Sequence, residues 1–293
     1  MIERRLTVFD AVARLKSFTR AAEAIHMTQP AVTFHVRKIE EHFGTRLFDR
    51  KHNRIDLSAA GELVYGYCKE ILAQHAEMEA AVREFTGNLA GLMVLGASTT
   101  IAEYVLPSVL AGFKKRRPEV VVRLLVSNTE GIIRMVEDNE VDLGIVEAPV
   151  DNQSLAVRLL RRDNLVVVVR PGHPLAERTE VRVEEILEYP FIAREEGSGT
   201  RDVIAGSLTE AGITPDDLDV VVELGSPEAI KGAVAAGLGI TVISVATLAN
   251  ELQLGTLIAV PLAPRIERPF SFVHRKQRAR FPAVEEFIEF AIG

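Results

Sequence analysis

Cysteine is nearly absent from this chain: among its 293 residues there is one, Cys68. A single cysteine cannot form an internal disulfide, so we expect the protein to work in a reducing compartment such as the cytoplasm. Long apolar runs are also missing. The charged first five residues lead into no apolar segment of a secretory signal, and the longest uncharged stretch, residues 232–250, is broken by Gly237 and Gly239. We expect neither export nor a membrane span.

The motifs of common catalytic sites are missing as well. The sequence has no Walker loop, no H-E-x-x-H and no C-x-x-C, and Glu196 occupies the first glycine position that a G-x-S-x-G motif would need. The seven histidines are scattered, and none stands at metal-ligand spacing beside a carboxylate. Residues 237–239 lack the third glycine and the preceding strand of a dinucleotide site. We therefore expect no enzyme, no cofactor and no metal.

Charge is unevenly distributed along the chain. The net charge is −7, yet residues 1–58 carry 11 Lys/Arg against 7 Asp/Glu, a balance of +4, which leaves −11 on the rest. A basic segment on an acidic body is expected when only that segment contacts phosphate. The asymmetry favours a nucleic-acid partner and disfavours a solute-binding transport protein, whose fold would suit the second half of the chain.

Helical periodicity at the start of the chain predicts short helices joined by tight turns. The first helix is indicated by apolar residues at helical spacing, Leu6, Phe9, Val12 and Ala13. We expect Ser17 to cap a second helix over residues 19–25. Thr28 is placed to cap a third, which has Pro30 in its first turn and ends at Gly44. This arrangement is typical of a helix-turn-helix.

The third helix has two different faces at about 100° per residue. One is an apolar stripe that we expect to be buried, formed by Val32, Val36, Ile39 and Phe43. We expect the other face, with the helix start, to read duplex DNA through Thr28, Gln29, Pro30, Thr33, Phe34 and Arg37. Phe34 lies almost opposite the apolar stripe and is suited to contact a thymine methyl. The alternative is a surface aromatic that a neighbouring chain covers.

Residues 47–57 predict a two-stranded wing, because two apolar pairs flank a basic, polar tip. Arg50, Lys51 and Arg54 are placed to contact DNA phosphates, and the alternative is that they are solvated surface charges. The next segment predicts a coiled-coil seam, because its apolar residues alternate spacings of four and three. The seam consists of Val64, Cys68, Ile71, His75, Met78, Val82 and Phe85. Its expected partner is the same helix of a second copy, giving a homodimer on a partly palindromic operator.

From residue 91 onward, strand and helix patterns alternate in two successive sets, which predict an α/β fold with parallel sheets in two lobes. The first set comprises strands 92–97, 120–126 and 142–146 with helices 101–115 and 131–137. The second comprises strands 165–169, 220–223 and 240–244 with a helix after Gly199 and another over 227–236. In such folds a ligand binds in the cleft at the carboxyl ends of the strands.

Small polar residues are concentrated at these strand ends and at the helix starts that follow. Hydroxyl groups and free N–H groups at helix N-termini bind anions, so we expect a small anionic or carboxylated effector. The residues expected to bind it are Ser98, Thr99, Thr100, Asn128, Glu147, Ser198, Gly199, Thr200 and Ser226. The alternative for any one of them is ordinary N-capping.

The amino-terminal segment resembles the LysR-type transcriptional regulators. The residues that carry the resemblance are Phe9, Val12, Ser17-Phe18-Thr19, Ala21-Ala22, Thr28-Gln29-Pro30-Ala31-Val32, Leu47-Phe48, Arg50, Leu57-Ser58 and Gly61. The rest of the chain resembles the co-inducer domain of that family. The resemblance implies dimers or dimers of dimers, and two Rossmann-like lobes of periplasmic-binding-protein type. The implied divisions are a winged helix-turn-helix over 1–58, a linker helix over 59–86, and an effector domain over 87–293 (lobe I about 87–162 and 268–293, lobe II about 163–267).

Within that family, three segments resemble the regulators of Calvin-cycle carbon fixation and of sulfur assimilation, namely residues 106–107, 194–201 and 223–231. Regulators of aromatic or organic-acid metabolism remain the alternative. The implied partners are double-stranded DNA, a small effector of unknown identity and a second copy, with RNA polymerase as a further candidate.

The chain departs from the family pattern in three respects. Thr33 stands where serine is usual, and Phe34 and His35 replace residues that are more often polar. Glu196 replaces a common proline and adds negative charge beside the expected anion site. Either Arg201 offsets this charge or Glu196 points to solvent.

Overall fold

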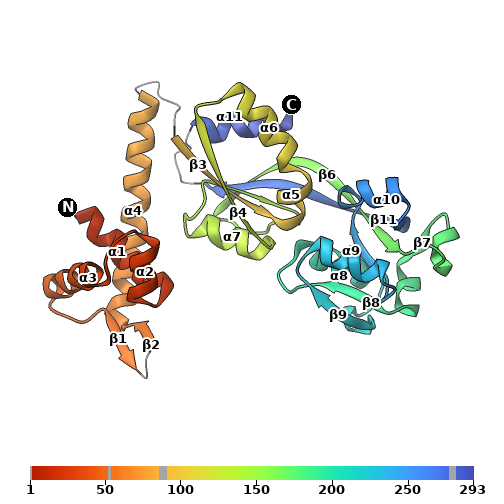
Figure 1. Cartoon of the computed structure of the whole chain (residues 1–293), viewed down its shortest axis with the longest axis horizontal. Helices are drawn as coiled ribbons and strands as arrows, with labels where there is room; N and C mark the ends of the chain where they lie inside the picture. The colour runs from red at the N-terminus through yellow and green to blue at the C-terminus, as the bar shows by residue number, and fades with distance from the viewer. Residues whose placement is uncertain (1, 52–53, 86–90, 277–281) are drawn as a thin grey trace. The chain divides into compact units, whose positions relative to one another are not determined.

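In the first unit of the chain, residues 1–86, three short helices and a β-hairpin precede one long helix among the described residues (Figure 1). The computed structural model describes residues 2–51, 54–85, 91–276 and 282–293. The elements are α1 (Ile2–Leu15), α2 (Phe18–Ala24), α3 (Gln29–Phe43), β1 (Phe48–Lys51), β2 (Arg54–Leu57) and α4 (Ala59–Phe85). The predicted helices and the two-stranded wing are confirmed.

The helix ends follow the predicted capping with one exception. Ser17 Oγ accepts a hydrogen bond from the N–H of Arg20 at 3.3 Å, and Pro30 lies in the first turn of α3. Thr28 occupies the N-cap position with an extended backbone, but its side chain makes no capping hydrogen bond. The capping role predicted for its hydroxyl is therefore wrong, and the side chain is exposed.

The buried face of α3 is shorter than predicted. Its buried residues are Val32, Val36 and Ile39. Phe43 is 51% exposed, so its assignment to the core is wrong. The reason is that Gly44, at a left-handed φ of 65°, turns the chain so that Leu47 and Phe48 fill the end of the core instead. Glu40 stabilises this return, because its carboxylate accepts hydrogen bonds from both of their N–H groups, at 2.8 and 3.4 Å.

Helix α4 carries an apolar stripe, but part of the predicted seam faces inward. Cys68 is buried and Val64 half-buried against the core of the first three helices, so neither is available to a second copy. Among the side chains of α4 that the structure describes, the large exposed apolar ones are Leu63, Tyr67, Ile71, Met78 and Val82. They lie within about 100° of the helix circumference. The side chain of Phe85 lies outside those that the structure describes.

Two long antiparallel strands, β6 (Leu155–Val169) and β11 (Ile258–Arg275), run through the second unit, residues 87–293. The other elements of its first lobe are β3 (Gly91–Ser98), α5 (Thr99–Tyr104), α6 (Leu106–Arg116), β4 (Val120–Ser127), α7 (Thr129–Glu137), β5 (Leu143–Val146) and α11 (Pro282–Ile292). Those of its second lobe are β7 (Val181–Arg182), β8 (Phe191–Arg194), α8 (Gly199–Glu210), β9 (Val220–Leu224), α9 (Pro227–Ala235), β10 (Thr241–Ser244) and α10 (Ala249–Leu254). Four 3-10 turns in this lobe among the described residues are η1 (Pro174–Glu177), η2 (Val183–Glu188), η3 (Pro215–Asp217) and η4 (Val245–Thr247).

The sheets are mixed, so the predicted parallel pairing holds for only some of the strands. Strands β4, β3 and β5 are parallel, as are β8 and β9, but β11 pairs antiparallel with β5 and β6, and β10 pairs antiparallel with β6. The difference arises because the chain crosses between the lobes on β6 and returns on β11. The predicted helix over 101–115 is also divided, with Val105 between α5 and α6 and Pro107 in the first turn of α6.

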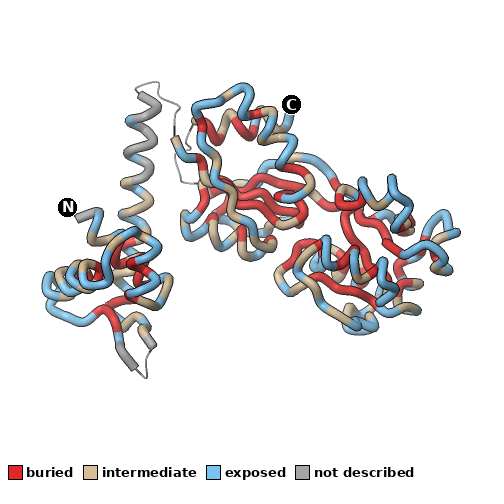
Figure 2. The backbone as a smooth tube through the Cα atoms, in the orientation of Figure 1, coloured by how far each residue is buried: buried red, intermediate tan, exposed pale blue. Residues whose placement is uncertain are grey.

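Each lobe has apolar clusters of its own, and Figure 2 shows buried backbone through the strands of both. The last helix, α11, packs on the first lobe. The ring centroids of Phe287 and Phe113 are 5.1 Å apart, and Glu286 forms a two-point ion pair with Arg117 at 2.6 and 2.7 Å. Among the described residues, no helix is both long and apolar enough to cross a membrane.

The burial of Cys68 predicts a thiol that does not react in the folded protein. Desolvation, reinforced by the charge of Asp10, raises the pKa of Cys68 to about 12. At pH 8 the nucleophilic thiolate is then rarer by a factor on the order of a thousand than at an ordinary cysteine. Reaction with Ellman's reagent should therefore become rapid only on unfolding in urea, with Cys68→Ser as the background control. Equal rates in the native and unfolded protein would contradict this burial.

Candidate functional site

In the first lobe, three parallel strands end side by side. Ser98 at the end of β3 is in register with Ser127 at the end of β4, and Ala97 is in register with Ile145 of β5. Glu147 therefore follows β5 at the same edge of the sheet. This is the edge at which α/β sheets bind ligands.

The N-terminus of α8, from the second lobe, lies directly against this edge. Asn128 Nδ2 donates a hydrogen bond to the carbonyl oxygen of Glu196 at 2.9 Å, and the N–H of Glu130 donates to that of Gly197 at 3.2 Å. A Cβ added at Gly199 would lie 2.7 Å from Thr129 Oγ1 and 3.0 Å from a backbone carbonyl, which is too close for any side chain. Glycine is therefore required where the lobes meet.

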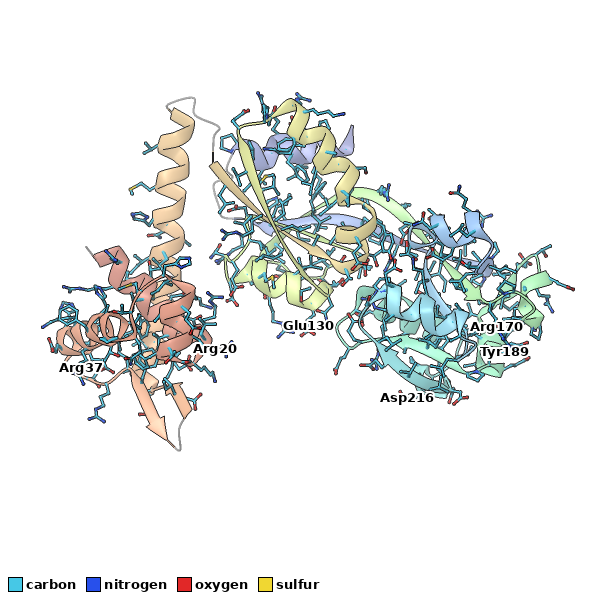
Figure 3. All side chains as sticks on the ribbon, viewed as in Figure 1. Arg20, Arg37, Glu130, Arg170, Tyr189 and Asp216 are labelled. Atoms are coloured by element: carbon cyan, nitrogen blue, oxygen red, sulfur yellow. The ribbon has the colours of Figure 1, made fainter. Side chains whose placement is uncertain are left out.

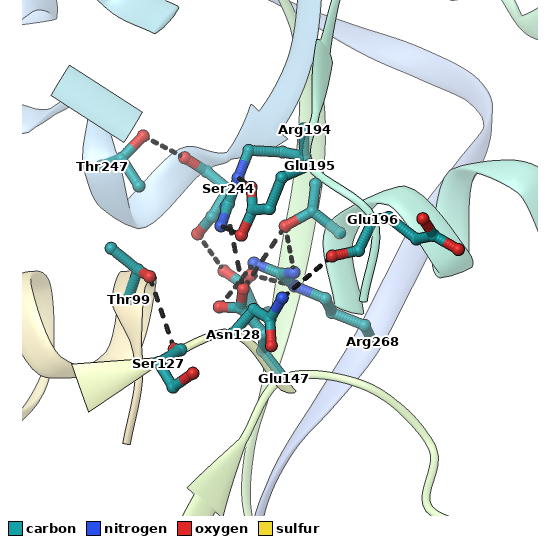
Figure 4. A network of polar contacts seen from close by, with 12 residues as sticks. Thr99, Ser127, Asn128, Glu147, Arg194, Glu195, Glu196, Ser244, Thr247 and Arg268 are labelled. Atoms are coloured by element: carbon teal, nitrogen blue, oxygen red, sulfur yellow. Dashed lines mark hydrogen bonds and ion pairs between the residues drawn. The ribbon is translucent and has the colours of Figure 1, made fainter. Parts of the chain in front are cut away.

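A buried ionic network connects both lobes behind this contact (Figure 4). The side chain of Arg268 is fully buried, and its Nε donates to Asp163 Oδ2 at 2.8 Å while its Nη1 donates to Thr200 Oγ1 at 2.7 Å. Its Nη2 lies 3.4 Å from Glu147 Oε2, and Arg194 Nη1 lies 3.9 Å from Glu147 Oε1. Arg194 also binds the carboxylate of Glu195 through two nitrogens, at 2.8 and 3.0 Å. Glu147 is thus held between two guanidinium groups.

Several buried polar atoms around this network have no hydrogen-bond partner among the described residues. They are Ser98 Oγ, Thr129 Oγ1, Ser198 Oγ, Glu147 Oε2 and Arg268 Nη2. Their residues are at most 5% exposed. Buried polar groups are nearly always hydrogen-bonded, because a buried polar group without a hydrogen bond costs about 1–3 kcal/mol of stability. Two of the five, Glu147 Oε2 and Arg268 Nη2, form an ion pair with each other at 3.4 Å but no hydrogen bond, whereas the three hydroxyls have no described partner. Such atoms from both lobes are expected for a site built to receive a polar ligand.

The alternative of ordinary N-capping holds for one residue of the predicted set. Asn128 Oδ1 accepts from the N–H of Gly131 at 2.9 Å and so caps α7. Ser98, Ser198 and Ser226 occupy N-cap positions, but their side chains make no capping hydrogen bond. Their hydroxyls are not used to stabilise the helix starts.

The other predicted residues differ in how they join this group. Thr200 lies in the network, and Thr99 Oγ1 donates to the carbonyl oxygen of Ser127 at 3.5 Å. Thr100 is buried in the first turn of α5. Ser226 is half-buried, and within the described chain its side chain makes no hydrogen bond to the network. The structure thus joins residues from both lobes but leaves Ser226 apart.

Sequence reasoning left out the charged residues of the network. Arg194, Asp163 and Arg268 were not expected to take part, although Arg194 ends the buried strand β8, and Asp163 and Arg268 each stand two positions before a buried run of β6 or β11. A charged residue next to such a run is the signal that could have pointed to them, because a buried charge needs a partner. Thr129 was missed because it follows Asn128, which has the N-cap position.

The expected negative charge of Glu196 does not enter the site. Glu196 is exposed, and its carboxylate is turned away from the network in Figure 4. Arg201 does not offset it, because its Nη1 lies 2.6 Å from Glu223 Oε2. Of the two alternatives, the structure supports a carboxylate that points to solvent.

A second contact joins the lobes through α5 and α9. The Tyr104 hydroxyl donates to Glu228, and Lys231 Nζ lies 2.8 Å from Glu228 Oε1 and 5.2 Å from the Tyr104 ring centroid. Hydrogen bonds from Lys231 and Tyr104 lower the pKa of Glu228. Burial and the charge of Glu228 raise the pKa of Glu103 next to this pair. The carboxylate of Glu228 therefore stabilises the contact between the lobes.

In the first unit, the exposed face of α3 presents most of the predicted DNA-contacting residues. Gln29 Nε2 donates to Thr33 Oγ1 at 3.0 Å, so these two polar side chains hold each other in place. Phe34 is 56% exposed, with Lys38 Nζ 5.8 Å from its ring centroid. Arg37 is exposed and extends away from the helices in Figure 3.

For the basic residues of the wing, which are predicted to contact phosphates, the structure describes only the backbone. Lys51 pairs with Arg54, and Arg50 pairs with Ile55, across the hairpin of β1 and β2. The side chains of the three basic residues lie outside those that the structure describes. Their contact with phosphate therefore stays a prediction. Within the described chain, no group of three His, Cys, Asp or Glu residues could hold a metal ion.

Comparison with known proteins matches both units of the chain. Residues 4–62 match the bacterial regulatory helix-turn-helix protein, lysR family, and residues 86–292 match the LysR substrate binding domain. The RuBisCO operon transcriptional regulator of Allochromatium vinosum is 34% identical over 291 residues, which cover 99% of this chain and 95% of that protein.

Solved structures show the same architecture. Full-length OxyR of Pseudomonas aeruginosa superposes with a TM-score of 0.73 at 22% identity, over 99% of this chain and 94% of that one, and this shows the fold alone. The CcmR regulatory domain of Synechocystis, solved in complex with 2-PG, is 30% identical with a TM-score of 0.64. It covers 69% of this chain, and the match spans 96% of that domain.

The unpartnered hydroxyls predict an unusual pair of stability effects. Ser198→Ala removes a buried hydroxyl that has no described partner, so the melting temperature should stay the same or rise. Asn128→Ala is the comparison, because it removes a working cap together with the hydrogen bond to the carbonyl oxygen of Glu196, and it should cost about 1 kcal/mol or more. Thermal unfolding of both variants without added ligand measures this. A loss for Ser198→Ala as large as that for Asn128→Ala would show that its hydroxyl has a structural bond.

Proposed function

Because the chain belongs to the LysR family of bacterial helix-turn-helix transcriptional regulators, we propose that it controls carbon-fixation genes in response to a small anionic effector bound between its two lobes. The chain is a DNA-binding regulator and not an enzyme, since both of its units match a family of transcriptional regulators. The observation that carries the effector proposal is the group of five buried polar atoms, from both lobes, that make no hydrogen bond among the described residues. We propose that the protein acts in the cytoplasm.

We assign the three expected segments to separate tasks. Residues 1–58 bind DNA, residues 59–86 form the dimer, and residues 87–293 bind the effector. The exposed stripe of α4 supports the second assignment, because five large apolar side chains on one helix face are suited to burial against a second copy. Such a dimer supplies two copies of α3 for a two-fold-related operator.

In the DNA-binding segment, α3 enters the major groove and the wing lies along the backbone. Gln29 and Thr33 offer hydrogen-bonding groups to base edges, and Phe34 offers an apolar surface to a thymine methyl. Arg50 and Arg54 contact phosphates, which adds affinity without base preference. The exposure of the Gln29, Phe34 and Arg37 side chains supports this division of tasks.

In the effector domain, the ligand binds at the edge where β3, β4 and β5 end and α8 begins. The site residues that we propose are Ser98, Thr99, Thr100, Asn128, Glu147, Ser198, Gly199, Thr200 and Ser226, together with the guanidinium groups of Arg194 and Arg268. A ligand that contacts both lobes favours one arrangement of them. This preference changes how the dimer presents its two copies of α3 to DNA, which couples ligand binding to operator binding.

The pathway rests on the similarity over nearly the full length to a regulator named for the RuBisCO operon. Genome-wide mapping of binding sites in the source organism should find occupied, partly palindromic sites upstream of RuBisCO genes. Sites confined to promoters of other pathways would exclude carbon fixation while leaving the regulatory function in place.

The DNA-binding assignment predicts two different kinds of loss. Gln29→Ala should lose base preference at a half-site, by an amount on the order of 1–3 kcal/mol per bidentate contact. Arg54→Ala should weaken binding to every sequence and lower the slope of log affinity against log salt by about one. Titrations of operator and scrambled duplexes at several salt concentrations separate the two. An Arg54→Ala protein with altered base preference and an unchanged salt slope would show that the wing is assigned wrongly.

A further inference from the structure

We propose that Glu147 selects effectors that join a negative charge to an O–H group, such as a hydroxy acid or an oxyanion that keeps a proton. This inference rests on the proposed function, because it specifies the chemistry of the ligand that binds in the same cleft. It concerns which anions the site accepts and which it rejects.

The two oxygens of Glu147 differ in their surroundings. Oε1 accepts from the Thr200 hydroxyl at 3.5 Å and lies 3.9 Å from Arg194 Nη1. Oε2 is buried and has no hydrogen-bond donor among the described residues, although Arg268 Nη2 lies 3.4 Å away. A carboxylate oxygen accepts hydrogen bonds and donates none. A ligand group that completes Oε2 is therefore a donor.

Of the other groups without a hydrogen bond, one requires the opposite kind of partner and three can take it. Arg268 Nη2 can only donate, and the hydroxyls of Ser98, Thr129 and Ser198 can donate as well. Together with the helix starts of α7 and α8, they are suited to accepting oxygens of an anion. The site therefore offers several donors and one fixed acceptor, and its ligand carries several acceptors and one donor.

The charge of the network strengthens the preference for anions that carry an O–H group over anions that do not. In the network, the carboxylates of Glu147, Asp163 and Glu195 outnumber the guanidinium groups of Arg194 and Arg268 by one. An anion without a proton to donate would place its oxygens against Glu147 with repulsion and no bond. An anion with an O–H group forms a charge-assisted hydrogen bond to the same oxygen.

Two matched pairs of probes test the inference on the full chain. Glycolate carries the hydroxyl that acetate lacks, and inorganic phosphate at pH 7 carries the proton that sulfate lacks. Isothermal titration and thermal shift should show that the member with the donor binds about tenfold or more tightly in at least one pair, since a hydrogen bond to a charged group contributes this much.

Glu147→Gln is the decisive variant, because its amide nitrogen donates where the carboxylate only accepted. In this variant the preference should fall to about twofold or reverse, as expected when the bond to a charged acceptor is lost. Glu196→Gln is the matched control: it removes the same charge from an exposed side chain that is turned away from the site, and it should keep the preference.

Two results would overturn the selection while leaving the cleft as an anion site: equal binding of both members of each pair to the wild-type chain, or an undiminished preference in Glu147→Gln. If no probe binds the wild-type chain, then both the selection and the proposed anion site are wrong. Operator binding by the same samples shows separately whether the regulator is folded and active. The wild-type comparison decides the question even if Glu147→Gln does not fold.

Discussion

The second unit depends on the contacts that the fully buried guanidinium of Arg268 makes with Asp163, Thr200 and Glu147. Removing a charge from water costs several kcal/mol unless partners surround it, and here the partners come from different segments. Asp163 stands opposite Arg268 where β6 and β11 cross between the lobes, Thr200 begins α8, and Glu147 follows β5. One side chain thus fixes the crossing strands relative to the start of α8 in the second lobe and the end of β5 in the first. A ligand that binds Glu147 or Thr200 therefore acts on the group that holds the lobes together.

Local patterns predicted the first unit well because its elements are short and close in sequence. The faces of α3 follow from helical periodicity, and the left-handed turn follows from Gly44. Phe43 is a residue for which helical periodicity gave the wrong prediction. Periodicity placed it in the core, but Leu47 returns after the turn and takes that space. Which of two apolar residues fills a core depends on tertiary packing, and no helical pattern contains that information.

In the second unit, too, local features could be predicted from the sequence and long-range contacts could not. The polar residues at strand ends could be found because strand ends and helix starts are local features. The antiparallel course of β6 and β11 could not be found, because it depends on pairing between segments about a hundred residues apart. The pairing of Asp163 with Arg268 has the same origin. Hence Ser98 and Ser198 were expected at the site, whereas the cation that organises it was not.

The close approach at Gly199 has a consequence for kinetics. There the start of α8 lies against Thr129, and nearby the backbone of Glu130 is bonded to that of Gly197. Any motion that separates the start of α8 from the start of α7 has to break these contacts first, so they add to the barrier against it. A side chain introduced at Gly199 acts on that barrier, because it pushes the two segments apart.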